Sequence, residues 1–103
     1  MRSNCRLILT EEAEGDLRSI LAFSLENWGN DRRDIYAERV TNAMNELLTH
    51  PQLGRTQDDI FTGLRSRLVG QHVIYYLIDE PNIAIIRILH VKMDPTRHLH
   101  SLE

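Results

Sequence analysis

The stretch of sequence that decides the fold is GLRSRLVGQHVIYYLIDEPNIAIIRILH, residues 63–90. In its first part, Leu64 and Leu68 alternate with Arg65 and Arg67. Because successive side chains of a strand point to opposite faces, this period of two predicts a half-buried strand. It also places the two arginines on the face opposite to the two leucines.

Two more strands are expected further along this stretch. Gly70 and Gln71 form a plausible two-residue turn into residues 72–78, which are rich in β-branched and aromatic side chains. Residues 79–82, with the sequence DEPN, predict a second turn. Residues 83–91 are apolar at nearly every position, which is typical of a central strand covered on both faces.

Upstream of these strands the apolar side chains recur at helical spacing. Thr10 is expected to cap a first helix, and Gly29 is expected to end it. A second helix begins near Asn30 or Asp31 and stops before Pro51. The very short break between them predicts an antiparallel helical hairpin. The expected inner faces comprise Ala13, Leu17, Ile20, Leu21, Ser24 and Trp28 in the first helix, and Tyr36, Val40, Ala43, Met44, Leu47 and Leu48 in the second.

The remaining segments complete an α+β fold. Residues 6–9 predict an opening strand, residues 51–62 a loop, and Asp94-Pro95 the start of a last helical turn. The expected order is β-α-α-β-β-β, an N-terminal strand and a helical hairpin packed on a twisted antiparallel sheet. The length suits one domain over residues 1–103.

Composition limits the classes of function. With 42% hydrophobic residues and a formal charge of −3, the chain is expected to be globular. Its apolar runs are too short to cross a bilayer, its start does not resemble a signal peptide, and its single cysteine, Cys5, suits a reducing compartment; together these predict a cytoplasmic protein without membrane contact. Cys5 is expected to be a partly buried thiol rather than a nucleophile.

The basic residues are almost all arginine, with Lys92 the only lysine. Arginine suits carboxylate, phosphate or aromatic partners, although a compositional bias would produce the same count. The mildly acidic total argues against broad nucleic-acid binding, and we expect none directly.

Several short motifs follow one another along the chain. They are Asp16-Leu17-x-x-Ile20, Trp28-Gly29, His50-Pro51-x-x-Gly54, Gly63-Leu64-Arg65, His72-Val73-Ile74-Tyr75-Tyr76, and Arg87-Ile88-Leu89-His90-x-x-Met93-Asp94-x-x-Arg97-His98-Leu99. Each motif alone is weak, because short patterns recur by chance. In this order and at these intervals, over nearly the whole length, they resemble the ParE toxins of the RelE/ParE superfamily.

The resemblance implies the fold inferred above and a noncatalytic function. It implies a toxin of a type II toxin–antitoxin system, active in growth inhibition and in plasmid or chromosome maintenance. It implies DNA gyrase as the target, no cofactor, and a ParD-like antitoxin whose C-terminal segment wraps the toxin in a hetero-oligomer. Phe23 departs from the pattern, since ParE-like sequences often carry tyrosine there.

Two groups of residues are candidates for these contacts. Arg97, His98 and Leu99 are the candidates for target inhibition, which the resemblance places at the C-terminal end. The structural alternative is that Arg97 pairs with a nearby carboxylate while Leu99 packs against the sheet. The antitoxin-binding candidates are two apolar side chains off the main stripe of the first helix, for which core positions are the alternative, and two strand arginines that can bind carboxylates: Phe23, Leu25, Arg65 and Arg67.

Two other functions remain open at this stage. One is a ribosome-dependent mRNA endoribonuclease of the RelE type, which needs a general base, a general acid and cations for the phosphate. The other is an inert interaction module. We expect no catalytic residues and no metal site, because no pattern of ligands accompanies the C-terminal histidines. The side chains that a nuclease would have to bring together are Arg65, Arg67, Arg87, His90, His98 and His100.

Overall fold

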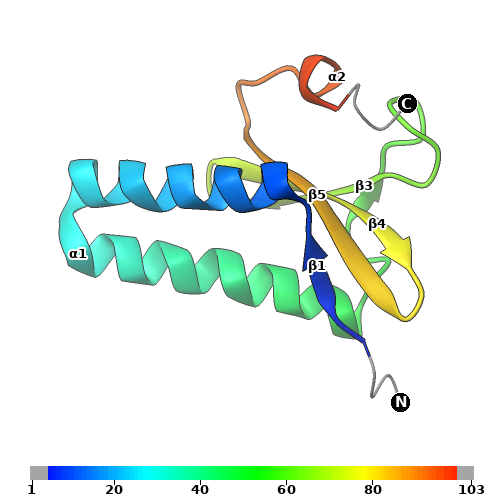
Figure 1. Cartoon of the computed structure of the whole chain (residues 1–103), viewed down its shortest axis with the longest axis horizontal. Helices are drawn as coiled ribbons and strands as arrows, with labels where there is room; N and C mark the ends of the chain where they lie inside the picture. Colours follow the sequence, from blue (N-terminus) through cyan, green and yellow to red (C-terminus); the bar gives the residue numbers. More distant parts are fainter. Residues whose placement is uncertain (1–4, 100–103) are drawn as a thin grey trace.

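A sheet with one strand buried on both faces organises the molecule. The computed structural model describes residues 5–99, apart from the side chains of residues 23–34. Within that part, five strands lie side by side in the order β1-β5-β4-β3-β2 (Figure 1). Their bounds are Leu7–Leu9 for β1, Arg55–Thr56 for β2, Arg65–Val69 for β3, His72–Asp79 for β4 and Asn82–His90 for β5.

Strand β5 is the central strand that the apolar run predicted. Ile83, Ile85 and Ile88 are buried in a cluster on the face covered by the long helix. Ile86 and Leu89 are buried in a second cluster on the opposite face. The register shifts between Ile85 and Arg87, where Ile86 has no partner in β4, so β5 carries a β-bulge next to Arg87.

The sheet departs from the sequence prediction at both edges. The predicted α+β fold and the antiparallel meander of β3, β4 and β5 are confirmed, but β1 pairs with β5 in parallel, with Leu7 opposite Ile83, so the sheet as a whole is mixed. A parallel pair needs a long crossover connection, and the chain between β1 and β5 supplies one. Strand β2 lies within the segment predicted as a loop. Its residues, Arg55 and Thr56, are both exposed, so no apolar alternation reveals it.

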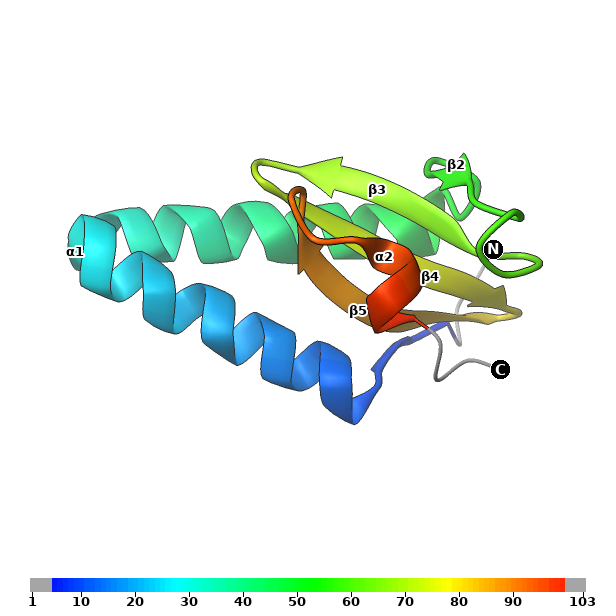
Figure 2. The ribbon, with the colours of Figure 1, turned by 90° about the horizontal axis from the view of Figure 1, so that it is seen from above.

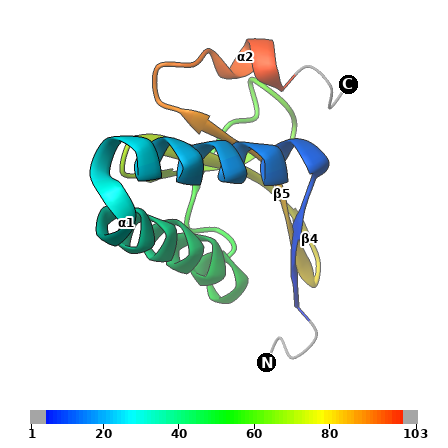
Figure 3. The same ribbon diagram turned by 60° about the vertical axis from the view of Figure 1, so that its left-hand side comes forward.

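The long helix α1, Glu11–Thr49, folds back on itself. A straight helix of 39 residues would be about 58 Å long, whereas the longest extent of the molecule is 37 Å. Figures 1 and 3 show two antiparallel arms, here called the N-terminal arm (residues 11–22) and the C-terminal arm (residues 35–49). The predicted hairpin is therefore confirmed.

The predicted end of the first helix at Gly29 is wrong, because α1 continues through Gly29 and Asn30. A glycine inside a helix costs only about 1 kcal/mol relative to alanine, which does not by itself end helical hydrogen bonding. The chain therefore reverses within α1, between its two arms.

Thr10 ties the start of α1 to the edge of β5. As predicted, its hydroxyl oxygen caps the helix, accepting a hydrogen bond from the Ala13 amide at 3.0 Å. The same hydroxyl donates to the carbonyl oxygen of Ile86 at 2.7 Å. The Thr10 amide also donates to the Ile85 carbonyl at 3.1 Å. The N-terminal arm therefore continues along the edge of β5 that β1 leaves uncovered.

A short helix, α2 (Pro95–His98), closes the second face of the sheet. Asp94 caps it as predicted, accepting a hydrogen bond from the Thr96 amide at 3.0 Å. Figure 2 shows α2 lying over β4 and β5. Among the residues that the structure describes, no helix combines the length and the apolar character needed to cross a bilayer.

The loop after α1 is held to the sheet by Tyr76. The Tyr76 hydroxyl donates to the Pro51 carbonyl at 2.7 Å and accepts from the Gly54 amide at 2.9 Å. Gly54 is buried, and a Cβ built on it would lie 2.7 Å from both the Ser66 carbonyl oxygen and the Tyr76 hydroxyl. The close approach of loop and sheet therefore requires a glycine at this position.

Replacing Gly54 with alanine is expected to lower the free energy of unfolding by about 1–3 kcal/mol, the usual cost of forcing an extra methyl group into a packed site. Gly15→Ala is the matched control, since the nearest atom to a Cβ there is 3.9 Å away on the flexible Arg18 side chain. Gly15→Ala should be neutral or stabilising by up to about 1 kcal/mol. Urea unfolding of both variants tests this, and equal stabilities would contradict it.

Candidate functional site

A pocket of about 510 Å³ lies where both arms of α1 meet the end of the sheet. Residues of each arm, of the turn between β3 and β4, and of the end of β5 surround it. Its surface is mainly apolar, as is usual for a ligand-binding pocket, although most of the residues that line it also carry a polar or charged group. The lining residues are Asp16, Ser19, Ile20, Tyr36, Arg39, Gly70, Gln71, His72, Ile88, His90 and Met93.

Tyr36 fixes the wall of the pocket formed by the β3–β4 turn. Its hydroxyl, the carbonyl oxygen of Val69 and Nδ1 of His72 form one hydrogen-bonded group. Gly70 has a φ of 58°, and a Cβ on it would lie 2.8 Å from a ring carbon of Tyr36. The turn therefore packs directly against the C-terminal arm, which makes this wall of the pocket preorganised.

His90 stands beside His72, with the ring centroids 5.4 Å apart in an edge-on arrangement. The Lys92 amide donates to Nδ1 of His90 at 3.1 Å. Since an amide can only donate, Nδ1 carries no proton, and Nε2 has the hydrogen that faces the Gln71 side-chain oxygen at 3.3 Å. Both nitrogens of His90 thus have partners in the neutral ring.

The environment keeps His72 and Tyr36 uncharged. Burial lowers the pKa of His72 below its usual 6.5, the nearby His90 lowers it further, and Asp16 opposes the shift. Burial also raises the pKa of Tyr36, against the effects of the Gln71 backbone and Arg39. At neutral pH the pocket therefore presents a neutral His72 and a protonated Tyr36.

Asp16 and Arg87 form an ion pair beside the pocket. The Arg87 Nε and Nη2 groups donate to the two carboxylate oxygens of Asp16 at 2.7 and 2.9 Å. The Arg87 side chain is 20% exposed and the Asp16 side chain is 16% exposed. Asp16 also accepts from the Ile88 amide at 3.0 Å, and Arg87 donates to the His98 carbonyl at 3.2 Å. The guanidinium group of Arg87 thus connects β5 to the N-terminal arm and to α2.

The two strand arginines face the helical side of the sheet, opposite Leu64 and Leu68, as predicted. Arg65 donates to the carbonyl oxygens of Gln52 and Gly54, at 3.3 and 2.7 Å. Arg67 donates to the Ala43 carbonyl at 3.2 Å and pairs with Glu46 at 2.7 Å. Their hydrogen bonds therefore fasten the loop and the C-terminal arm to β3.

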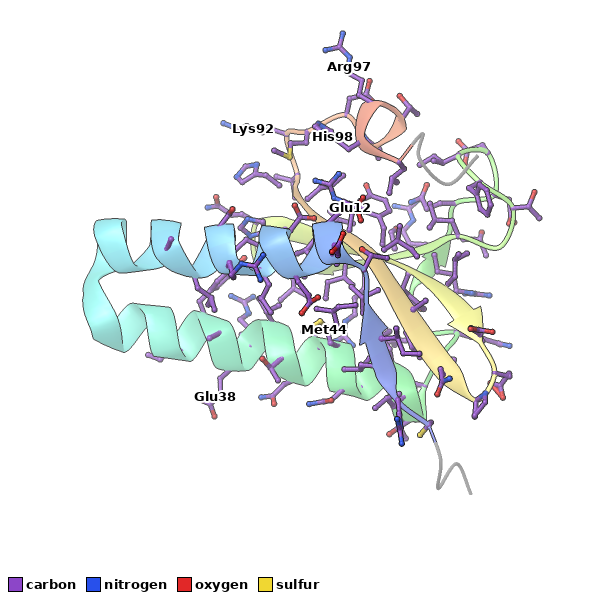
Figure 4. The ribbon with its side chains drawn as sticks, viewed as in Figure 1. Glu12, Glu38, Met44, Lys92, Arg97 and His98 are labelled. Atoms are coloured by element: carbon purple, nitrogen blue, oxygen red, sulfur yellow. The ribbon has the colours of Figure 1, made fainter. Side chains whose placement is uncertain are left out.

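The C-terminal candidates divide between surface and core. Arg97 is exposed, and Figure 4 shows it pointing away from the sheet. His98 is partly buried at the end of α2. Leu99 is only 3% exposed and belongs to the second cluster, as the structural alternative expected. His100 and the side chains of Phe23 and Leu25 lie outside the described residues.

Sequence reasoning missed Tyr36 and His72 as parts of one site. Tyr36 occurs on an apolar helical stripe and therefore reads as core, and His72 opens a strand 36 positions further on. Asp16 and Arg87 carried a better signal. Arg87 is the only charged residue in β5, and Asp16 opens the first of the motifs quoted above. In the described part of the chain, no group of three His, Cys, Asp or Glu residues is placed to hold a metal ion.

The chain belongs to the ParE toxins of type II toxin–antitoxin systems. The family model for the "ParE toxin of type II toxin-antitoxin system, parDE" matches residues 7–95. This range includes both members of the Asp16–Arg87 pair and every residue of the pocket lining.

Individual relatives agree with the family model. Toxin ParE1 of Mycobacterium tuberculosis is 30% identical over 95 residues, covering 91% of this chain and 97% of that protein. Toxin ParE1 of Caulobacter vibrioides is also 30% identical, over 88% of this chain and 94% of its own length. A solved structure described as a chromosomal ParDE TA system from P. aeruginosa has the same fold, with a TM-score of 0.71 at 18% identity over 84% of this chain and 95% of its own.

The ring of His72 is expected to titrate below pH 6.5 in the folded protein, because burial disfavours its charged form. The unfolded chain then binds the extra proton first, so the contribution of His72 to stability is complete above pH 6.5 and is lost as the pH falls toward the folded pKa. Histidine proton resonances followed by NMR between pH 4 and 8 give the midpoint. A midpoint at or above the unfolded value contradicts the prediction.

Asp16→Asn is expected to lower the free energy of unfolding by about 2–4 kcal/mol, because it leaves the partly buried Arg87 without its counter-charge. Glu46→Gln is the control, since the Glu46 side chain is 55% exposed and its pair with Arg67 is worth at most about 1 kcal/mol. Denaturant unfolding measures both variants. If the two lost the same stability, the Asp16–Arg87 pair would have no special structural role.

Proposed function

We propose that this protein inhibits DNA gyrase by binding to it, without catalysis, and that a ParD-like antitoxin neutralises it in the cytoplasm. The observation that carries the proposal is the match to the ParE toxin family over residues 7–95. The relatives named Toxin ParE1 match along nearly their whole length, so the similarity extends over the entire toxin domain of those proteins.

The use of the arginines supports a binding function over a nuclease. RNA cleavage needs cations free to neutralise the phosphate as charge develops. The guanidinium groups of Arg65, Arg67 and Arg87 instead donate to backbone carbonyls and carboxylates of the protein itself. The three strand arginines that the sequence offered to an RNA site are therefore already used to hold the fold together.

The rival reading, an endoribonuclease, draws its support from the adjacent rings of His72 and His90. A general acid and a general base need nitrogens that can exchange protons with the substrate. Nδ1 of His90 accepts from the Lys92 amide, and Nδ1 of His72 bonds to the Tyr36 hydroxyl. Nε2 of His90 also faces the Gln71 side-chain oxygen, so both nitrogens of that ring have partners within the protein, and the ring is poorly placed to exchange a proton with a substrate.

The segment proposed to contact gyrase is α2 with its exposed Arg97. Leu99 anchors the end of the helix in the second cluster, and Asp94 caps its start. A short helix fixed at both ends presents its outer side chains at a defined position. Arginines in such positions are frequent anchors of protein–protein interfaces.

Purified gyrase supplies the test. We expect the toxin to abolish supercoiling of relaxed plasmid, and Arg97→Ala to raise the half-inhibitory concentration at least about tenfold, which corresponds to about 1.4 kcal/mol of binding free energy. Arg55→Ala is the matched control, because Arg55 is an exposed arginine on the far edge strand β2. It should change the value less than about twofold.

Unchanged supercoiling at micromolar toxin would remove gyrase as the target. Primer extension on transcripts isolated after induction of the toxin then tests the alternative function, an mRNA endoribonuclease. Cuts at fixed codon positions would establish the endoribonuclease, whereas a DNA-damage response without cuts agrees with gyrase inhibition.

A further inference from the structure

The pocket between the arms of α1 and the β3–β4 turn is not explained by the proposed contact of α2 with gyrase. Its volume of about 510 Å³ lies in the range of sites that hold small ligands or one or two large side chains. Ile20, Ile88 and Met93 contribute its apolar surface. Two of these, Ile20 and Ile88, belong to the hydrophobic core, so the pocket opens directly onto it.

The walls of the pocket are fixed before any ligand enters. The bond between Tyr36 and His72 holds one wall, and the contact of Gly70 with the Tyr36 ring holds the turn against the helix. On the other side, Asp16 is held by Arg87 and by the Ile88 amide. Binding to such a site costs little reorganisation, which favours affinity.

The charge at the rim selects the kind of ligand. Asp16 lines the pocket, but its carboxylate is neutralised by Arg87. Arg39 also lines the pocket, is exposed, and has no carboxylate within ion-pair distance among the described side chains. The rim therefore carries one positive charge beside an apolar cavity, which is complementary to an apolar group followed by a carboxylate.

We infer that this pocket is an anchor site for an acidic amphipathic peptide segment, which inserts an aromatic or long aliphatic side chain and pairs a neighbouring carboxylate with Arg39. The inference rests on the proposed function, in which such a segment belongs to the antitoxin. Single apolar anchors flanked by charges are how amphipathic segments bind grooves. A nucleic acid fits the site less well, because the single guanidinium of Arg39 in the pocket lining offers little to a run of phosphates.

A small probe tests the site without the antitoxin. 3-Phenylpropanoate carries both the ring and the carboxylate, and 3-phenylpropanamide is its neutral match. In NMR titrations of the full chain, the acid should shift the ring resonances of His72 and His90 and the amide of Gln71, with millimolar affinity. The neutral amide should bind the same place about three- to fivefold more weakly, the range expected for one exposed ion pair.

Variants separate the apolar and the charged contribution. Arg39→Gln should make the acid and the amide bind equally, whereas Arg18→Gln, an exposed arginine of the N-terminal arm outside the pocket lining, should preserve the difference. Ser19→Trp fills the mouth of the pocket and should abolish the shifts. Absence of shifts in the wild-type chain at 20 mM acid, or equal binding of acid and amide to it, overturns the inference.

The experiments distinguish a wrong anchor-site inference from a wrong proposed function. A chain that leaves gyrase and growth unaffected, yet binds the acid at His72 and His90, loses the toxin function and keeps the anchor site. A chain that inhibits gyrase but shows no shifts keeps the toxin function and loses the anchor site.

Discussion

The ion pair between Asp16 and Arg87 is the constraint on which the arrangement of the molecule depends. It joins the N-terminal arm of α1 to the central strand β5 and, through the carbonyl of His98, to α2. Both carboxylate oxygens and three guanidinium nitrogens are used, so these elements cannot shift apart without separating a partly buried pair of charges. The first and the last of the family motifs are therefore two halves of one physical feature.

The sequence predicted those parts of the fold that depend on local chemistry. The caps at Thr10 and Asp94 follow from side chains that bond to amides two or three residues away, and the burial of β5 follows from its own apolar run. The direction of β1 and the existence of β2 depend on pairing with distant strands. Arg55 and Thr56 are both exposed and polar, so no apolar alternation in the sequence indicates such pairing.

The site was less predictable than the fold, for a related reason. Alternation placed Arg65 and Arg67 on the correct face of β3, but it could not tell that the loop and the C-terminal arm would supply their partners. The bond between Tyr36 and His72 joins two residues that look ordinary in their own segments, a core tyrosine and a strand histidine. A pocket formed by four separate segments has no signature in any one of them.

The segment after the bulge contributes to both proposed surfaces. His90 and Met93 line the pocket, which faces the helices, while Asp94 caps α2 on the opposite side of the sheet. A partner seated in the pocket would thus touch Met93, the residue directly before the cap of the helix that presents Arg97. Occupation of the pocket would restrain the root of α2, and the bulk of the partner would lie close to it. The partner would then neutralise the toxin because it lies next to α2, and no rearrangement of the sheet would be required.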